Sequence, residues 1–261
     1  IALTIASISV LVAMLTGFRV LTTLWLAGAQ EPSPLLEESG VWWRASRVIG
    51  LSTAVRAAEG FLPLIMLGAL TNMEQAGFFR VASSVVVFVS MAENMITVMV
   101  PALTARLYEE GDVARLRLFC AASCIVMSVP TIGIAIILWV FGGPLLAFAF
   151  GVDFAPAWAA LAVLTIGAGI SALGGISISL LHVGNKERDV TRACAFSLSV
   201  SALGSFLLAP QYGAFGVAVA VLCGVVIRTA YLAYASRQYI GIDPTLIGAL
   251  KTIFYSLMLR K

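Results

Sequence analysis

The chain has 261 residues, of which 61% are hydrophobic and only 11% are charged. A soluble domain carries about 25% charged residues, and a mean hydropathy of +1.02 leaves too little polar surface to face water. These values exclude an ordinary soluble fold and predict an all-α polytopic membrane protein. The net charge of +3 is too small and too dispersed to indicate nucleic-acid binding.

Apolar runs of membrane-crossing length follow one another along the chain, since a bilayer core takes about 20 helical residues. The first run, Ile1 to about Gly17, has no starting Met and no basic flank like that of a signal peptide. We therefore expect a helix cut into from upstream, and a chain that is a fragment. Six complete spans are predicted after it, at about 45–70, 76–103, 118–141, 157–182, 190–209 and 213–236.

Lys and Arg alternate between successive connections, as the positive-inside rule expects. One set of connections is nearly bare of cations: TNMEQ, GGPLLAFAFGVD and PQY. This alternation places the C-terminus in the cytoplasm. The tail after Asp243 is too short to span and carries an apolar face, so we expect it on the inner membrane surface, unless it begins another span. The other set of connections contains Arg19, Arg44, Arg47, Arg106, Arg115, Arg117, Lys186, Arg188, Arg192, Arg237, Lys251, Arg260 and Lys261.

Signatures of enzymes and metal sites are missing from the sequence. It contains no GxSxG, no HExxH and no phosphate-binding Gly-rich loop, and its single histidine, His182, has no partner ligands nearby. The four cysteines show no metal-binding spacing and are expected to be small buried hydrophobic residues. We therefore predict a protein that is not an enzyme and needs no metal or cofactor.

Ionisable residues at membrane depth are the strongest functional signal, because they are costly unless they face a bundle interior or a wet cavity. In the second span, Arg56 and Glu59 are three residues apart and share a helix face. They are expected to neutralise each other. The sequence leaves open whether the pair lines a cavity or only holds the helix against its neighbours.

A polar stripe runs along the third span at helical spacing, through Ser90, Glu93, Asn94, Thr97 and Pro101. Such a stripe is not expected to face lipid. In the seventh span, small residues lead at four-residue steps to Arg228, which either faces a cavity or extends to the inner headgroups. Similar ridges of small residues, which favour close helix packing, occur at Gly167, Ser171, Gly175 and Ser179 and at Ser197, Ser201 and Ser205.

Three stretches resemble the C-terminal half of bacterial polysaccharide or O-antigen flippases, in the multidrug/oligosaccharidyl-lipid/polysaccharide exporter superfamily. The first, EQAGFFRVASSVVVFVSMAENMITVMVPALTARLYEEGDVARLR, passes from a span into a charged helix. The second is FGVDFAPAWAALAVLTIG, an outer loop leading into a span. The third is LLHVGNKERDVTRACAFSLSVSALGSFLLAPQYGAFGVAVAVLCGVVIRTAYL, with its Pro-x-Tyr-Gly turn. The resemblance extends over roughly residues 45–242, and the three stretches lie within it.

The resemblance implies one six-helix lobe of a two-lobe transporter. On this basis residues 1–29 are the last helix of a preceding lobe and the start of a linker, and residues 30–44 are a cytoplasmic linker. Residues 45–236 are the C-terminal six-helix transmembrane lobe, and residues 237–261 are a cytoplasmic or interfacial amphipathic tail. The implied location is the bacterial inner membrane.

The implied function is flipping of an oligosaccharide linked to undecaprenyl pyrophosphate, for surface polysaccharide synthesis. The resemblance also implies partners, namely a polysaccharide polymerase and glycosyltransferases, besides the lipid bilayer. We carry over no binding residues from the family. The site residues are predicted only from the position of ionisable and polar side chains within the membrane-spanning segments. Arg56, Arg228 and Asn94 are predicted to line the substrate cavity, and Glu59 and Glu93 to couple transport to an ion. The alternatives are a multidrug or small-solute cation-coupled antiporter and a membrane assembly subunit that transports nothing.

Overall fold

A computed structural model describes residues 39–91, 113–174, 176–184 and 186–240, single residues between 93 and 110, and residue 248. The chain divides into two compact units, Ile1–Arg47 and Val48–Lys261. The helical bundle belongs to the second unit. All regular structure in the described residues is helical. The elements are α2 (Ser39–Leu70), α3 (Met73–Val89), α5 (Val113–Phe150), the short 3₁₀ helix η1 (Val152–Phe154), α6 (Ala157–Leu173), α7 (Ser177–Val183) and α8 (Glu187–Ile240).

Three of these helices are long and apolar enough to cross a membrane, over Thr53–Leu70, Arg115–Phe150 and Glu187–Tyr239. The membrane class predicted from composition is thus supported, with fewer such helices than the six complete spans expected. Two expected spans are interrupted in the structure. In the span predicted at 76–103, α3 ends at Val89 with Ser90 as its C-cap, and Met91, Glu93 and Val100 are again helical. The span predicted at 157–182 is broken after Leu173.

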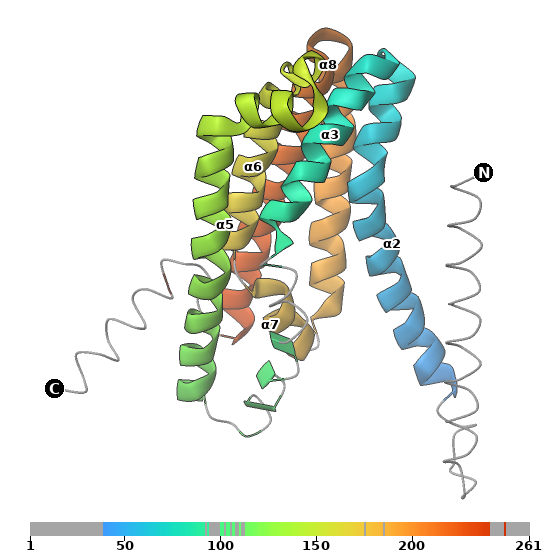
Figure 1. Cartoon of the computed structure of the whole chain (residues 1–261). Helices are drawn as coiled ribbons and strands as arrows, with labels where there is room; N and C mark the ends of the chain where they lie inside the picture. The colour runs from blue at the N-terminus through green and yellow to red at the C-terminus, as the bar shows by residue number, and fades with distance from the viewer. Residues whose placement is uncertain are drawn as a thin grey trace, which may run out of the picture. The chain divides into compact units, whose positions relative to one another are not determined.

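Helix α8 has 54 residues and contains two of the predicted spans, 190–209 and 213–236. A straight helix of that length measures about 80 Å, far more than a bilayer core of about 30 Å. The chain instead reverses at Gly213, whose φ of 56° and ψ of −135° are not helical. Figure 1 shows the two arms side by side, joined by a turn. We call residues 187–212 the first arm and residues 214–240 the second arm.

Small residues let the two arms of α8 approach closely. A Cβ built on Gly204 lies 2.8 Å from the Cβ of Ala220, and one built on Gly216 lies 2.6 Å from the carbonyl oxygen of Leu208. Gly224 faces Ser201 in the same way. Ser197, Ser201 and Ser205 are all buried. These contacts confirm that the serine and glycine ridges of this region pack helix against helix.

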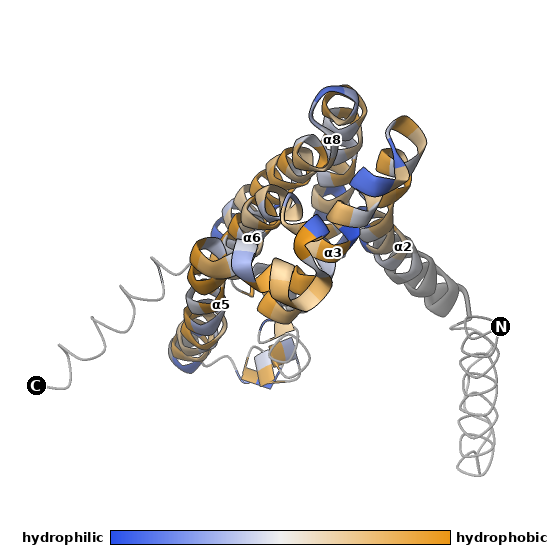
Figure 2. Ribbon diagram, turned by 45° about the horizontal axis from the view of Figure 1, so that its top comes forward, coloured by the Kyte–Doolittle hydropathy of each residue, from blue (hydrophilic) through white to orange (hydrophobic). Residues whose placement is uncertain are grey.

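The bundle is held by a core that α2, α3, α6 and α8 share. Leu67, Phe79, Ala82, Leu161 and Val217 are all at most 4% exposed and pack together in it. Helix α5 packs chiefly against α6, and Figure 2 colours most of its length as hydrophobic. Exposed side chains such as Ile136 and Phe141 on this helix are what lipid contact requires.

The cation-poor connections meet at one end of the bundle. The side chain of Gln75, just after the α2–α3 turn, accepts a hydrogen bond of 3.0 Å from the backbone N–H of Ala214 in the α8 turn. Phe154 of η1 stacks edge-on against Phe78 of α3, with ring centroids 5.9 Å apart. The TNMEQ, GVD and PQY segments are therefore neighbours, as alternating spans require.

The cation-rich connections meet at the opposite end. Lys186, between α7 and α8, lies over the ring of Tyr239 near the end of α8, 4.4 Å from its centroid. Leu116, near the start of α5, packs in a cluster with Leu180 of α7. The basic residues around positions 115–117 and 186–192 therefore belong to the same end of the bundle.

Candidate functional site

An ion pair joins α2 to the second arm of α8 in the interior of the bundle. Nη1 of Arg228 donates a hydrogen bond of 2.5 Å to Oε2 of Glu59, and the two side chains are 20% and 14% exposed. At 1.5 Å per residue, Arg228 lies about 22 Å along its helix from Gly213, and Glu59 lies about 17 Å from the end of α2. Both distances place the pair within the thickness of a bilayer core of about 30 Å.

This partner corrects the expectation that Glu59 pairs with Arg56. Three residues along one helix allow that contact, but Arg56 is exposed on α2 while Glu59 is partly buried toward α8. Pairing with Arg228 neutralises two charges in an apolar interior at once. Pairing with Arg56 would leave the Arg228 charge in that interior without a carboxylate partner. The oxygen Oε1 of Glu59 remains buried with no hydrogen-bond partner among the described residues.

A second carboxylate, that of Glu93, lies near Arg228. The hydroxyl of Ser171 on α6 donates a hydrogen bond of 3.1 Å to Oε1 of Glu93. Glu93, Ser171 and Arg228 line a small cavity with Gly174 and Ser177, of about 40 Å³. A water molecule needs at least about 10–15 Å³ measured in this way, and polar partners. The cavity therefore has room and hydrogen-bonding groups for water.

Arg228 thus lies near two acidic residues from different parts of the chain. It bonds Glu59 directly and shares the cavity with Glu93. The positive charges of Arg228 and Arg56 both act on the Glu93 carboxylate. Four of the five predicted site residues therefore belong to one electrostatic cluster, which we call the Arg228 cluster: Arg56, Glu59, Glu93 and Arg228. Asn94, the fifth, lies outside the described residues.

The interruption between α6 and α7 forms one wall of the cavity. Carbonyl groups released there accept hydrogen bonds from serine hydroxyls: Ser128 of α5 donates to Ala172 at 2.8 Å, and Ser177 donates to Gly174 at 2.5 Å. The second arm of α8 passes so close that a Cβ on Gly174 would overlap the methyl group of Thr229. Irregular backbone at membrane depth is tolerated where protein groups satisfy it in this way.

Sequence reasoning did not identify Ser177 and Gly174 as lining residues, and it assigned Ser171 to packing. The available signal was the ridge of small residues that contains Ser171, because small residues allow close packing and polar lining equally. Only the fold shows that one side of this ridge faces Glu93. Gly175, another residue of that ridge, lies outside the described residues.

The remaining candidates are placed away from the Arg228 cluster or have ordinary environments. Nδ1 of His182 lies 3.9 Å from Glu187 at the partly exposed end of α7. Cys120, Cys124 and Cys194 are buried and none of the cysteines is in a disulfide, while Cys223 is exposed. Within the described residues, His, Cys, Asp and Glu form no group of three that could hold a metal ion.

Comparison of this chain with protein-family models, with characterised proteins and with solved structures gives no match.

Proposed function

We propose that this chain forms one lobe of a membrane transporter that flips a lipid-linked oligosaccharide, by alternating access, across the bacterial inner membrane. The observation that carries the proposal is the Arg228 cluster, in which two arginines and two carboxylates lie at membrane depth and two of the four, Arg228 and Glu93, line a small cavity between helices. Ionisable groups at this depth are characteristic of transport pathways. The resemblance of residues 45–242 to flippases gives the substrate class, an oligosaccharide on undecaprenyl pyrophosphate.

The chemistry of the cluster suits an anionic headgroup. Guanidinium groups donate paired hydrogen bonds to phosphate oxygens. A pyrophosphate that reaches Arg228 competes with Glu59 for the same donors, so binding of substrate and opening of the α2–α8 ion pair are linked. Arg56 is exposed and carries a second positive charge into the cluster. Glu59 and Glu93 are the groups proposed to take up the coupling ion.

Substrate binding requires the helices around the cluster to separate. A cavity of about 40 Å³ holds water and not a pyrophosphate or a sugar. The interruption between α6 and α7 supports such movement, because broken helices at the substrate site are a recurrent feature of secondary transporters. The conformation described above is therefore proposed to be closed at this point.

The deciding experiment reconstitutes the protein in liposomes and follows a fluorescent lipid-linked oligosaccharide across the bilayer, with and without a proton gradient. We expect Arg228→Ala to abolish flipping and Glu93→Gln to change its ion dependence. The matched control is Arg106→Ala, since Arg106 is a surface arginine with 75% side-chain exposure that pairs with Glu110 one helical turn away. Unchanged flipping in Arg228→Ala removes Arg228 from the mechanism, and transport of cationic dyes instead would favour the drug antiporter.

A membrane assembly subunit is the second candidate, and one observation favours it. The Glu59–Arg228 pair is already satisfied between two helices, as expected of a static ion pair that joins them. Single cysteines at positions 56, 93 and 228 distinguish the two functions. In a transporter a small thiol reagent reaches each of them from an aqueous side, and in a static scaffold positions 93 and 228 stay unlabelled.

A further inference from the structure

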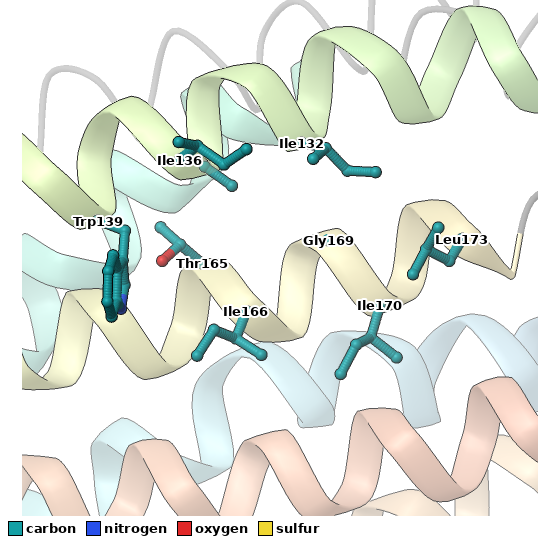
Figure 3. A pocket seen from close by; sticks show the side chains of 9 residues that line it. Ile132, Ile136, Trp139, Thr165, Ile166, Gly169, Ile170 and Leu173 are labelled. Atoms are coloured by element: carbon teal, nitrogen blue, oxygen red, sulfur yellow. The ribbon is translucent and has the colours of Figure 1, made fainter.

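An apolar groove runs between α5 and α6, and none of the residues of the Arg228 cluster lines it. Ile132, Ile136 and Trp139 line it from α5, and Ile166, Gly169 and Ile170 line it from α6 (Figure 3). Its volume is about 370 Å³, more than twice the roughly 150 Å³ of an engineered cavity that binds benzene. It extends about 10 Å along the helices, judged from the rise between Ile132 and Trp139.

The groove offers few hydrogen-bonding groups to a ligand. Two lining residues carry a polar atom: Thr165, whose hydroxyl already donates to the carbonyl of Ala162 at 2.8 Å, and Trp139, whose indole has a single N–H. A phosphate, a sugar or a peptide backbone needs more partners than these. Because α5 meets the membrane along most of its length, a hydrocarbon group is the ligand that this lining suits.

The shape of the groove selects a thin chain over another helix. Its rim consists of large side chains, and Ile136, Trp139 and Ile166 remain 57%, 54% and 47% exposed. Helices pack closely in membranes where small residues line the contact, and these large side chains keep a second backbone away. The space lies deeper, at Gly169, where an added Cβ meets no atom within 4 Å. A flexible hydrocarbon chain can enter it.

We propose that this groove binds one acyl chain of a membrane phospholipid, which acts as a structural lipid between α5 and α6. The position matters because α5 packs chiefly on α6 among the described helices. A chain seated in the groove adds apolar contact along the seam that holds α5 to the bundle. This inference does not depend on the proposed transport function.

The test uses Gly169→Leu, which places a side chain in the groove from a position where an added Cβ meets no atom within 4 Å. Gly133→Leu on α5 is the matched control, because Gly133 also has open space around it, lies inside a helix and does not line the groove. Both substitutions raise helix propensity equally. Each protein is purified in a mild detergent, stripped of lipid, and supplied with dioleoyl phosphatidylglycerol or dioleoyl phosphatidylethanolamine.

Native mass spectrometry then counts the phospholipids retained, and thermal unfolding is followed with and without the added lipid. We expect the wild type and Gly133→Leu to retain one phospholipid more than Gly169→Leu. Their melting temperatures should rise by a few degrees on lipid addition, while that of Gly169→Leu should not. If Gly169→Leu does not fold, Gly169→Ala should show an intermediate loss of lipid.

Three outcomes would overturn the proposal. Equal phospholipid retention in Gly169→Leu and Gly133→Leu places the bound lipid elsewhere. An isoprenoid lipid that stays bound through the stripping step and keeps the added phospholipid out identifies a different occupant. A dimer that only Gly169→Leu abolishes shows that the groove is covered by a second copy of the chain.

Discussion

At the scale of single residues, the decisive contact is the hydrogen-bonded ion pair between Glu59 and Arg228. Each charge alone in an apolar interior loses hydration worth several kcal/mol. Their mutual attraction offsets this loss only while both are present and in contact. Glu93 shares the same cation and obtains a further hydrogen bond from Ser171. The positions of these side chains are therefore coupled, although they come from distant parts of the chain.

Removal of one member of the pair should destabilise the protein more than removal of both. We expect Arg228→Gln to lower the free energy of unfolding by about 3 kcal/mol, because Glu59 is left charged in an apolar interior. The double variant Glu59→Gln with Arg228→Gln should recover at least about 1 kcal/mol of that loss. Denaturation in mixed detergent and SDS micelles measures all three values.

The exposed pair of Arg106 and Glu110 provides the comparison for this double-mutant cycle. Its side chains are 75% and 45% exposed, so solvent screens the pair and its coupling energy should be much smaller than that of Glu59 and Arg228. Strictly additive losses at Glu59 and Arg228 would show that the two charges do not depend on each other.

At the scale of elements, two features depart from regular transmembrane helices. Helix α8 folds back on itself at Gly213, and the α6–α7 segment is interrupted beside the cavity. Both are possible because side chains form hydrogen bonds with backbone groups that lack a partner in the helix. The Gln75 side chain does this at the α8 turn, and serine hydroxyls do it at the interruption. The close contact of the two α8 arms in turn requires residues without long side chains.

We expect Gly224→Val to separate the arms of α8. A Cβ at this position overlaps the hydroxyl of Ser201 and lies 2.9 Å from the carbonyl oxygen of Ser197, which cannot move without shifting the first arm. Overpacking of this kind costs about 1–3 kcal/mol, and thermal unfolding in detergent should show it.

Gly77→Val in α3 is the control for Gly224→Val, since a Cβ there meets no atom within 4 Å. It should leave the melting temperature nearly unchanged. Equal losses in the two variants would mean that the cost arises from the substitution in a helix and not from the contact between the arms.

At the scale of the second compact unit, the connections sort into two ends of opposite character. The cation-poor segments meet around Gln75, Phe154 and Ala214, and the cation-rich segments meet around Lys186 and Tyr239. This arrangement is what a bundle needs to obey the positive-inside rule. The same alternation gives the proposed orientation, with the cation-rich end and the end of α8 in the cytoplasm.

Labelling of single cysteines tests this orientation. In a cysteine-free background, cysteines at positions 72, 152 and 211 should react with a membrane-impermeant maleimide added outside spheroplasts. Cysteines at positions 117 and 187 should react only after the cells are opened. Labelling of all five from outside, or a mixed pattern within either group, would contradict the arrangement of the two ends.

The sequence by itself predicted an all-helical membrane protein, apolar helices in the regions 53–70, 115–150 and 187–239, and four charged residues that the structure brings together. Composition and the length of apolar runs carry this information because a bilayer excludes charge over a fixed thickness. The turn near Pro210 and Gly213 was predictable for the same reason, since no straight helix of that length fits a membrane. The serine and glycine ridges similarly indicated close packing before any partner was known.

The tertiary structure decided which charged residues form an ion pair. Spacing along α2 favoured Arg56 as the partner of Glu59, but 169 positions separate the residues that are in contact. Periodicity describes one helix at a time, and it does not show which neighbour a face meets. The interruption after Leu173 and the groove above Gly169 likewise depend on the helices around them. For that reason the fold, and not the pattern of residues, brought Arg228 together with two carboxylates.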